Sequence, residues 1–183
     1  MESVGARETD RQFAGSIPET YDRYLGPLLS EPYARDLAAR LAALAPARVL
    51  ETAAGTGVAT RALARALPAG TAIVATDLAR PMLDLAAARM ETAEVTWQQA
   101  DALALPFADG AFDAVACQFG AMFFPDKTAA YREARRVLRR GGRLVLSVWD
   151  RIESNELAHV VDEALAALFP ERAQAAAKMK AST

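Results

Sequence analysis

The chain has 183 residues, of which 52% are hydrophobic and 24% are charged, and its net charge is −2. This length suits one domain, and this composition supports a hydrophobic core rather than disorder. The absence of a basic stripe argues against nucleic-acid substrates. The longest apolar runs are too short to span a bilayer and the polar start is not a secretory signal, so we expect a cytoplasmic protein without membrane insertion. One cysteine and one histidine exclude an internal disulfide and a cysteine-based metal cluster, and we expect no metal.

Helices and strands are predicted to alternate along the chain. Residues 1–12 are expected to form a flexible tail, residues 13–170 one domain that begins with a helical segment over 13–46, and residues 171–183 a polar, alanine-rich tail. In the first helix, near 32–44, apolar residues recur at helical spacing and Pro46 closes it. The predicted strands are 49–52, 72–76, 95–99, 112–118 and 143–149, and the further helices are 58–67, 80–90, 126–139 and 155–169.

Five strands that alternate with helices predict an α/β fold with a parallel, doubly wound sheet. Right-handed crossovers place helices on both faces of such a sheet, and ligands bind beyond the carboxyl ends of its strands. The helix over 126–139 should end with Arg135, Arg136, Arg139 and Arg140, where the helix dipole favours cations, and stop at the glycine pair 141–142.

The most informative segment runs from Arg48 to Thr60, where an apolar strand passes through a glycine turn into a helix. Glycines serve at such turns because the backbone bends sharply or passes close to a ligand. Gly55 and Gly57 are present, but Thr60 stands where a dinucleotide fingerprint has its third glycine. Glu51 lies at the strand end, where a carboxylate would repel a pyrophosphate and suit a ligand that carries an ammonium group.

Acidic residues also follow the second and third strands. Asp77 ends the second strand, 20 residues after Gly57, where an acid can accept hydrogen bonds from both ribose hydroxyls. Asp101 follows the third strand. Glu51, Asp77 and Asp101 are therefore expected to meet at one edge of the sheet.

The segment from Glu51 to Gly57 resembles the first motif of class I S-adenosylmethionine (SAM)-dependent methyltransferases: acidic residue, any, small, any, Gly, any, Gly. Over about residues 13–150 the chain is similar to the small-molecule methyltransferases that include those of ubiquinone and menaquinone biosynthesis. The resemblance implies a Rossmann-like, mostly parallel sheet of order 3-2-1-4-5-7-6 in a full-length member, SAM as cofactor and a small-molecule acceptor. It is carried by residues 49–60, 75–82, 99–113, 118–126 and 133–149.

The resemblance implies a cofactor role for each residue at this edge. Glu51 would hold the methionine ammonium, the backbone at Ala53, Gly55 and Gly57 would approach the methionine and ribose, and Asp77 would bind the ribose hydroxyls. An aromatic face near the methyl group could also attract the sulfonium. The other expected contacts are Leu78 and Met82 beside the adenosine, Asp101 and Ala102 at the adenine edge, Gln118 and Phe119 near the methyl group, and Tyr21 and Tyr24 in an N-terminal lid.

Plain packing in the core or in a helix is an equal alternative for Met82, Phe119 and the two tyrosines. No catalytic base is identified, since methyl transfer can depend on alignment and the exclusion of water. His159 is expected at the surface and Cys117 to be a buried small residue.

The sequence departs from the family at its end, because no strand-like run follows residue 170. The lack of strands six and seven would leave 144–149 as an exposed apolar edge, which favours pairing with another chain. Three explanations stay open: a truncated fragment, an edge covered by a partner chain or by the helix over 155–169, or a tail that reflects how the sequence was defined. That edge or that helix would be the surface of a homodimer. Alternative functions are a degenerate or truncated SAM-binding module that associates through this edge and, less favoured, an NAD(P)-dependent oxidoreductase.

Overall fold

The computed structural model of the chain describes residues 29–90 and 95–170. The chain divides after Val148 into two compact units; the first contains the sheet and the second contains α7 (Glu156–Leu168). Tyr21, Tyr24 and both predicted tails lie outside the described residues. Among the residues described, no helix is long and apolar enough to cross a membrane.

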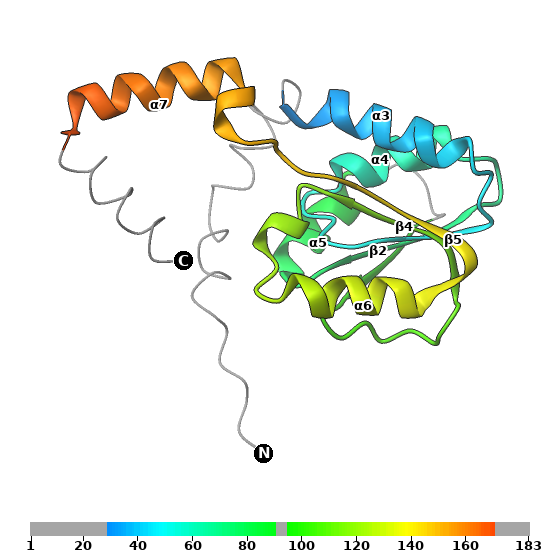
Figure 1. Cartoon of the computed structure of the whole chain (residues 1–183). Coiled ribbons are helices and arrows are strands. Elements are labelled where there is room, and N and C mark those ends of the chain that lie inside the picture. The colour runs from blue at the N-terminus through cyan, green and yellow to red at the C-terminus, as the bar shows by residue number, and fades with distance from the viewer. Residues whose placement is uncertain (1–28, 91–94, 171–183) are drawn as a thin grey trace. The chain divides into compact units, whose positions relative to one another are not determined.

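Five parallel strands form one sheet in the order β3-β2-β1-β4-β5 (Figure 1). This order confirms the arrangement expected for the first five strands, and the connections along the chain place the crossover point between β1 and β4. The strands are β1 (Arg48–Glu51), β2 (Ala72–Asp77), β3 (Val95–Gln99), β4 (Phe112–Gln118) and β5 (Leu138–Ser147).

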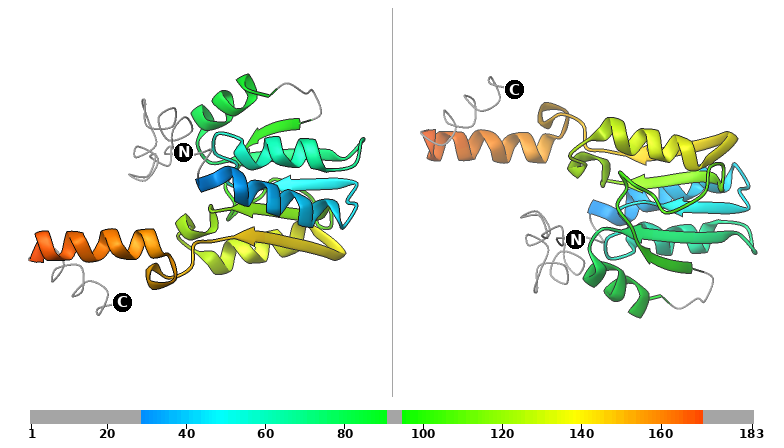
Figure 2. Two further views of the ribbon diagram at one scale, coloured as in Figure 1. Left: turned by 90° about the horizontal axis from the view of Figure 1, so that it is seen from above. Right: turned by 90° about the horizontal axis from the view of Figure 1, so that it is seen from below.

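Helices cover both faces of this sheet, as a doubly wound fold requires. α3 (Glu31–Ala42) and α4 (Val58–Ala66) lie over one face and α6 (Lys127–Val137) over the other (Figures 1 and 2). α5 (Arg80–Ala88) connects β2 to β3. A short 3-10 helix, η2 (Ala121–Phe123), follows β4.

The two faces have separate apolar cores because successive side chains of a strand point to opposite sides. Val49 packs with the face under α3 and α4, whereas its neighbour Leu50 packs with the face under α6, and both are fully buried. Burial on both faces is typical of parallel sheets and explains the continuous apolar runs of the inner strands.

The boundary between α6 and β5 differs from the prediction. α6 ends at Val137, and Leu138 already has an extended backbone that pairs with Phe112 of β4. The guanidinium of Arg139 forms an ion pair with the carboxylate of Asp113 rather than facing the helix terminus. Strand pairing and this ion pair therefore outweigh the dipole interaction that predicted a helix to residue 139.

Gly141 and Gly142 consequently lie inside the irregular first half of β5 instead of ending α6. Gly141 has φ of +80°, and a Cβ on Gly142 would lie 2.9 Å from the carbonyl oxygen of Asp113. Both positions favour glycine, but for a β-bulge and not for a helix cap. β5 also ends at Ser147, two residues before the predicted end.

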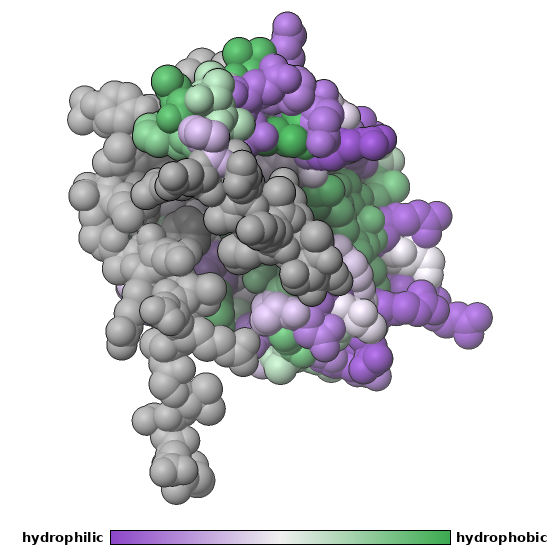
Figure 3. Space-filling view, turned by 60° about the vertical axis from the view of Figure 1, so that its left-hand side comes forward, coloured by the Kyte–Doolittle hydropathy of each residue, from purple (hydrophilic) through white to green (hydrophobic). Residues whose placement is uncertain are grey.

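The described part of the second unit contains η3 (Ile152–Ser154) and α7. The amide of Asn155 donates to the carbonyl oxygens of Asp150 and Arg151 at 3.2 and 2.9 Å. Several apolar side chains of α7, among them Val160 and Leu165, are exposed. On the face shown in Figure 3, hydrophobic and hydrophilic residues are interspersed.

Candidate functional site

The predicted site residues of the strands meet at the carboxyl edge of the sheet. Glu51 ends β1, Asp77 ends β2 and Gln118 ends β4, while Asp101 directly follows the loop residue after β3. Glu51 pairs in register with Ala75 of β2 and with Ala116 of β4. The parallel register therefore brings together side chains that are far apart in the sequence.

Glu51 is a buried acid without a partner for one of its oxygens. The residue is 1% exposed, and Oε2 has no hydrogen-bond partner in the described part of the chain. Burial raises the pKa of this carboxyl from 4.5 to about 8; the Asp77 carboxylate adds to the shift, and Thr60 and Arg61 oppose it. Thr60, which replaces the third glycine of the dinucleotide fingerprint, also has a buried hydroxyl without a partner among these residues. The surroundings of Glu51 therefore disfavour an isolated carboxylate and would suit a cation beside this group.

The loop after β1 contains three residues in the left-handed region. Ala53, Gly55 and Gly57 have φ of +53°, +55° and +78°. A Cβ on Gly57 would lie 3.0 Å from Cβ of Ala86 and 3.1 Å from the ring of Trp97, so this glycine permits close packing of α4. A Cβ on Gly55 would meet no atom of the described residues within 4 Å, so the described chain leaves space beside this glycine.

Asp77 connects this loop to the loop after β2. Its Oδ2 accepts from the N–H of Gly55 at 2.8 Å, and its Oδ1 accepts from the N–H of Ala79 at 2.9 Å. A carboxylate oxygen can accept more than one hydrogen bond. Leu78 beside it is 46% exposed, and Met82 on α5 is partly buried.

Asp101 organises the turn that follows β3. Its Oδ1 accepts from the N–H of Leu103 at 2.9 Å, and its carbonyl oxygen accepts from the N–H of Ala104 at 3.0 Å. Asp101 and Ala102 are both partly exposed, as a residue that contacts a ligand must be.

The region after β4 joins the sheet edge to α3. The amide of Gln118 donates to the carbonyl oxygen of Ser30 at 3.0 Å, whereas its Oε1 and the hydroxyl of Ser147 are buried without a partner in the described chain. The rings of Phe119 and Tyr33 meet edge to face, with centroids 5.2 Å apart. Phe119 has φ of +55°, a conformation that a bulky residue adopts rarely.

Three further residues of this region, Gly120, Ser30 and Tyr33, were not predicted from the sequence. A Cβ on Gly120 would lie 2.3 Å from Cβ of Ala53, so the loops after β1 and β4 touch at this glycine. The available signal for Gly120 was a glycine two residues after the end of a predicted strand. Ser30 and Tyr33 gave no signal, because their contacts with β4 and its loop link segments more than 80 residues apart. Cys117 is buried as predicted, and burial raises the pKa of its thiol.

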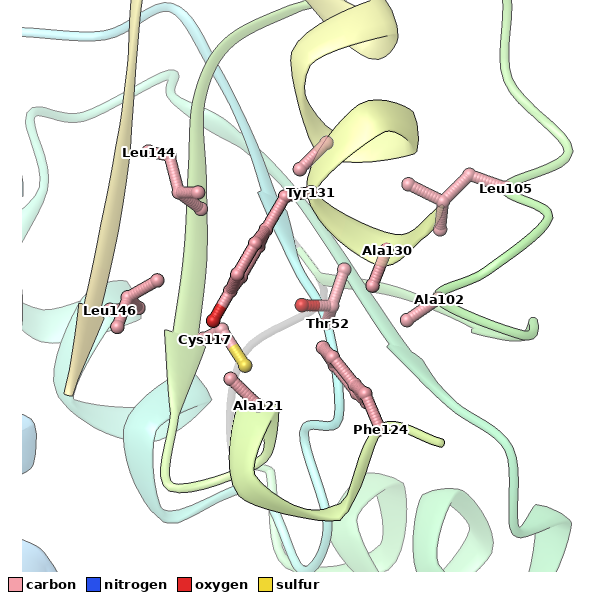
Figure 4. A pocket seen from close by; sticks show the side chains of 11 residues that line it. Thr52, Ala102, Leu105, Cys117, Ala121, Phe124, Ala130, Tyr131, Leu144 and Leu146 are labelled. Atoms are coloured by element: carbon pink, nitrogen blue, oxygen red, sulfur yellow. The ribbon is translucent and has the colours of Figure 1, made fainter. Parts of the chain in front are cut away.

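A small cavity lies between α6 and the sheet (Figure 4). Its volume is about 10 Å³, and its lining includes Thr52, Cys117 and Tyr131, whose hydroxyl end points toward Cys117 in Figure 4. Ligand pockets of drug-sized molecules measure roughly 300–1,000 Å³, so this cavity is not a cofactor site. Within residues 29–90 and 95–170, no three His, Cys, Asp or Glu side chains come together as a metal site.

The strand order, the glycine loop after β1 and the acids after β1, β2 and β3 define the Rossmann-like class of class I methyltransferases. The sequence pattern of a methyltransferase domain family matches residues 50–146, just over half of the chain. The chain therefore belongs to this methyltransferase domain family. Membership in this family argues against the alternative of an NAD(P)-dependent oxidoreductase.

Curated relatives agree with this assignment. The chain is 48% identical over 104 residues to the demethylmenaquinone methyltransferase of Thermus thermophilus, an alignment that covers 56% of this chain and 47% of that protein. It is 39% identical over 141 residues to the demethylmenaquinone methyltransferase of Deinococcus radiodurans, which covers 74% of this chain and 58% of that protein. The chain thus spans about half the length of the curated relatives it matches.

Solved structures show the same fold. A putative SAM-dependent methyltransferase from Methanococcus maripaludis superposes with a TM-score of 0.68 over 95% of this chain and 78% of that chain. The two sequences are 18% identical, so the likeness concerns the fold alone.

Proposed function

We propose that the chain binds SAM at the carboxyl edge of the sheet and takes part in methyl transfer to a small-molecule acceptor. The observation that carries this proposal is Glu51, a buried acid beside the glycine loop, one oxygen of which has no hydrogen-bond partner among the described residues. Such a site suits the ammonium group of the methionine part of SAM. When bound, SAM supplies a methyl group on a positively charged sulfur.

The neighbouring residues suit the rest of the cofactor. The backbone N–H of Gly55 holds the Asp77 carboxylate in place at the sheet edge, where this carboxylate would accept hydrogen bonds from the ribose hydroxyls. The exposed side chain of Leu78 offers an apolar surface next to that carboxylate. The turn at Asp101 and Ala102 would read the adenine edge.

The side of the site near Phe119 suits the acceptor. The N–H of Phe119 donates to the carbonyl oxygen of Ser147 at 2.9 Å, and Ser147 and Tyr33 both line a groove of about 400 Å³ between α3 and β5. Alignment of an acceptor there and exclusion of water would provide much of the acceleration. We assign no base; His159 belongs to the second unit, with its Nε2 3.5 Å from an oxygen of Glu163.

Demethylmenaquinone is the first acceptor to assay, because both relatives described above carry its name. The test measures release of S-adenosylhomocysteine (SAH) from SAM with and without reduced demethylmenaquinone. We expect acceptor-dependent release that is lost in Asp77→Ala. SAH binding without turnover would retain the cofactor assignment and reject this acceptor.

One observation favours the alternative function, a degenerate or truncated SAM-binding module that associates through the edge of the sheet. β5 is an outer strand of the sheet, and Leu144 on it is 36% exposed. Association of two copies through β5 or through α7 would cover apolar surface. Sedimentation at several concentrations, with and without SAH, distinguishes the two functions: a dimer without SAH affinity supports the module, and a monomer that binds SAH contradicts it.

A further inference from the structure

The connection between β3 and β4 contains no helix in the described chain, although it carries the two residues assigned to the adenine edge. Residues 100–111 form a turn at Asp101 followed by an irregular segment. Such a segment lacks a helix or sheet ladder to satisfy its backbone groups, so its position depends on other partners.

The side chain of Arg136 on α6 binds two carbonyl groups of this segment. Its Nη2 donates to the carbonyl oxygen of Leu105 at 2.9 Å, and its Nη1 donates to the carbonyl oxygen of Phe107 at 2.7 Å and to Oδ1 of Asp109 at 2.8 Å. Nε and Nη2 donate to the two carboxylate oxygens of Glu133, both at 2.7 Å. The guanidinium is 29% exposed and has a partner in every direction of its planar fork.

Glu133 completes the arrangement from the same helix. Its Oε2 also accepts from the N–H of Leu105 at 2.8 Å, so both backbone groups of Leu105 are bound by the Glu133–Arg136 pair. Leu105 is 5% exposed and packs in the core with Phe112 and Val137. The Arg136 guanidinium holds the pKa of the Glu133 carboxyl below its usual value, which keeps the pair ionised at neutral pH.

The fixed point at Leu105 lies close to the adenine edge. Only three residues separate it from Asp101, and the bond between the N–H of Ala104 and the carbonyl oxygen of Asp101 closes the intervening turn. A shift of Leu105 would therefore move Asp101 and Ala102 with it. The residues assigned to the ribose and the methionine are on β1, β2 and their loops, and none of the hydrogen bonds of the Glu133–Arg136 pair described above reaches them.

We propose that the Glu133–Arg136 pair positions the turn at Asp101 and Ala102 and thereby sets the base selectivity of the cofactor site. The pair acts through the backbone of Leu105 and contacts no ligand itself. This inference rests on the proposed function, because it requires that the turn faces the adenine.

The test compares Arg136→Lys and Glu133→Gln with the wild-type chain. Lysine keeps the positive charge but cannot bind two carbonyl groups and a carboxylate in one plane. Arg135→Lys is the matched control, since Arg135 is an exposed neighbour in the last turn of the same helix. Each protein is titrated with SAH and with S-inosylhomocysteine, in which an oxo group replaces the adenine amino group, and amide hydrogen exchange is measured over residues 101–110.

We expect the wild-type chain and the control to prefer SAH, and the preference to fall about tenfold in Arg136→Lys, as loss of one well-placed hydrogen bond to the base would cause. Exchange over 101–110 should accelerate in both variants of the pair. An unchanged preference in folded variants would overturn the inference and leave the proposed function intact. A wild-type chain that binds neither compound would overturn both. If Arg136→Lys does not fold, the preference measured for Glu133→Gln decides.

Discussion

At the scale of single residues, the site is dominated by a carboxyl group in an unfavourable environment. Glu51 is buried and feels the charge of Asp77, and burial raises its pKa to about 8, so the group is mostly protonated at neutral pH when no cation is present. A bound ammonium group would favour the ionised form and release a proton. Binding of the proposed cofactor should therefore strengthen as the pH rises toward 8.

The same residue predicts the pH dependence of stability. The pKa of this carboxyl is higher in the folded chain than the ordinary 4.5. Its contribution to the free energy of unfolding is therefore fully present below pH 4.5 and is lost as the pH rises to about 8. Asp77, Arg61 and Thr60 face the group and are unchanged in Glu51→Gln. We expect the free energy of unfolding of the wild type, relative to Glu51→Gln, to fall between pH 4.5 and 8 by at most about 5 kcal/mol. If urea unfolding gave the same pH dependence for the wild type and for Glu51→Gln, the raised pKa of Glu51 would be contradicted.

Asp77 tests the ribose assignment. Asp77→Ala removes the acceptor for the ribose hydroxyls and should weaken SAH binding by about 1–3 kcal/mol. Asp84→Ala is the control, because Asp84 lies on the following helix in an exposed ion pair with Arg80. Equal affinity of folded Asp77→Ala and wild-type chains in calorimetry would reject the role.

At the scale of elements, the loops after β1 and β4 fit together through Gly120. We expect Gly120→Ala to destabilise the chain by about 1–3 kcal/mol and to weaken SAH binding, because the new methyl group would overlap Cβ of Ala53. Ala53→Gly removes that methyl group at a residue with positive φ, where glycine is favoured. The double variant should regain part of both losses; a double variant no better than Gly120→Ala would contradict the contact.

Asp113 joins three elements away from the site. Its Oδ2 accepts from the N–H groups of Ala47 and Arg48 at 2.8 and 2.7 Å, and its other oxygen pairs with Arg139. Burial opposes ionisation of this carboxyl, yet the bonds to Arg48, Arg139 and Ala47 bring its pKa below the ordinary value.

Replacement of this carboxyl should therefore reduce stability. Asp113→Ala leaves two backbone N–H groups without their acceptor, and we expect urea unfolding to show a loss of about 2–3 kcal/mol. Asp36→Ala, which breaks an exposed ion pair with Arg40, should lose less than about 1 kcal/mol. Similar losses in the two variants would contradict the role of Asp113.

The elements also show where prediction from sequence succeeds. The helices and strands up to residue 118 were predicted within about two residues because apolar periodicity and glycine or proline signals agree there. The start of β5 was missed because its reasons are tertiary: Leu138 pairs with Phe112, and Arg139 binds Asp113. A local pattern of arginines followed by glycines cannot distinguish this arrangement from a helix end.

At the scale of the whole molecule, the sequence predicted which acids meet but not what surrounds them. Glu51, Asp77 and Asp101 converge because parallel strands end at one edge. The contact of Gln118 with Ser30 depends on how α3 lies against the sheet, which no spacing reveals. The domain limits, the roles of the site residues and the homodimer stay predictions.

The most direct test is a calorimetric titration of this chain with SAH, with NAD as the control. We expect SAH to bind at one site with micromolar affinity, about −8 kcal/mol, and NAD not to bind. A folded chain that does not bind SAH, or that binds NAD equally well, would contradict the assignment of this sheet edge as a SAM site.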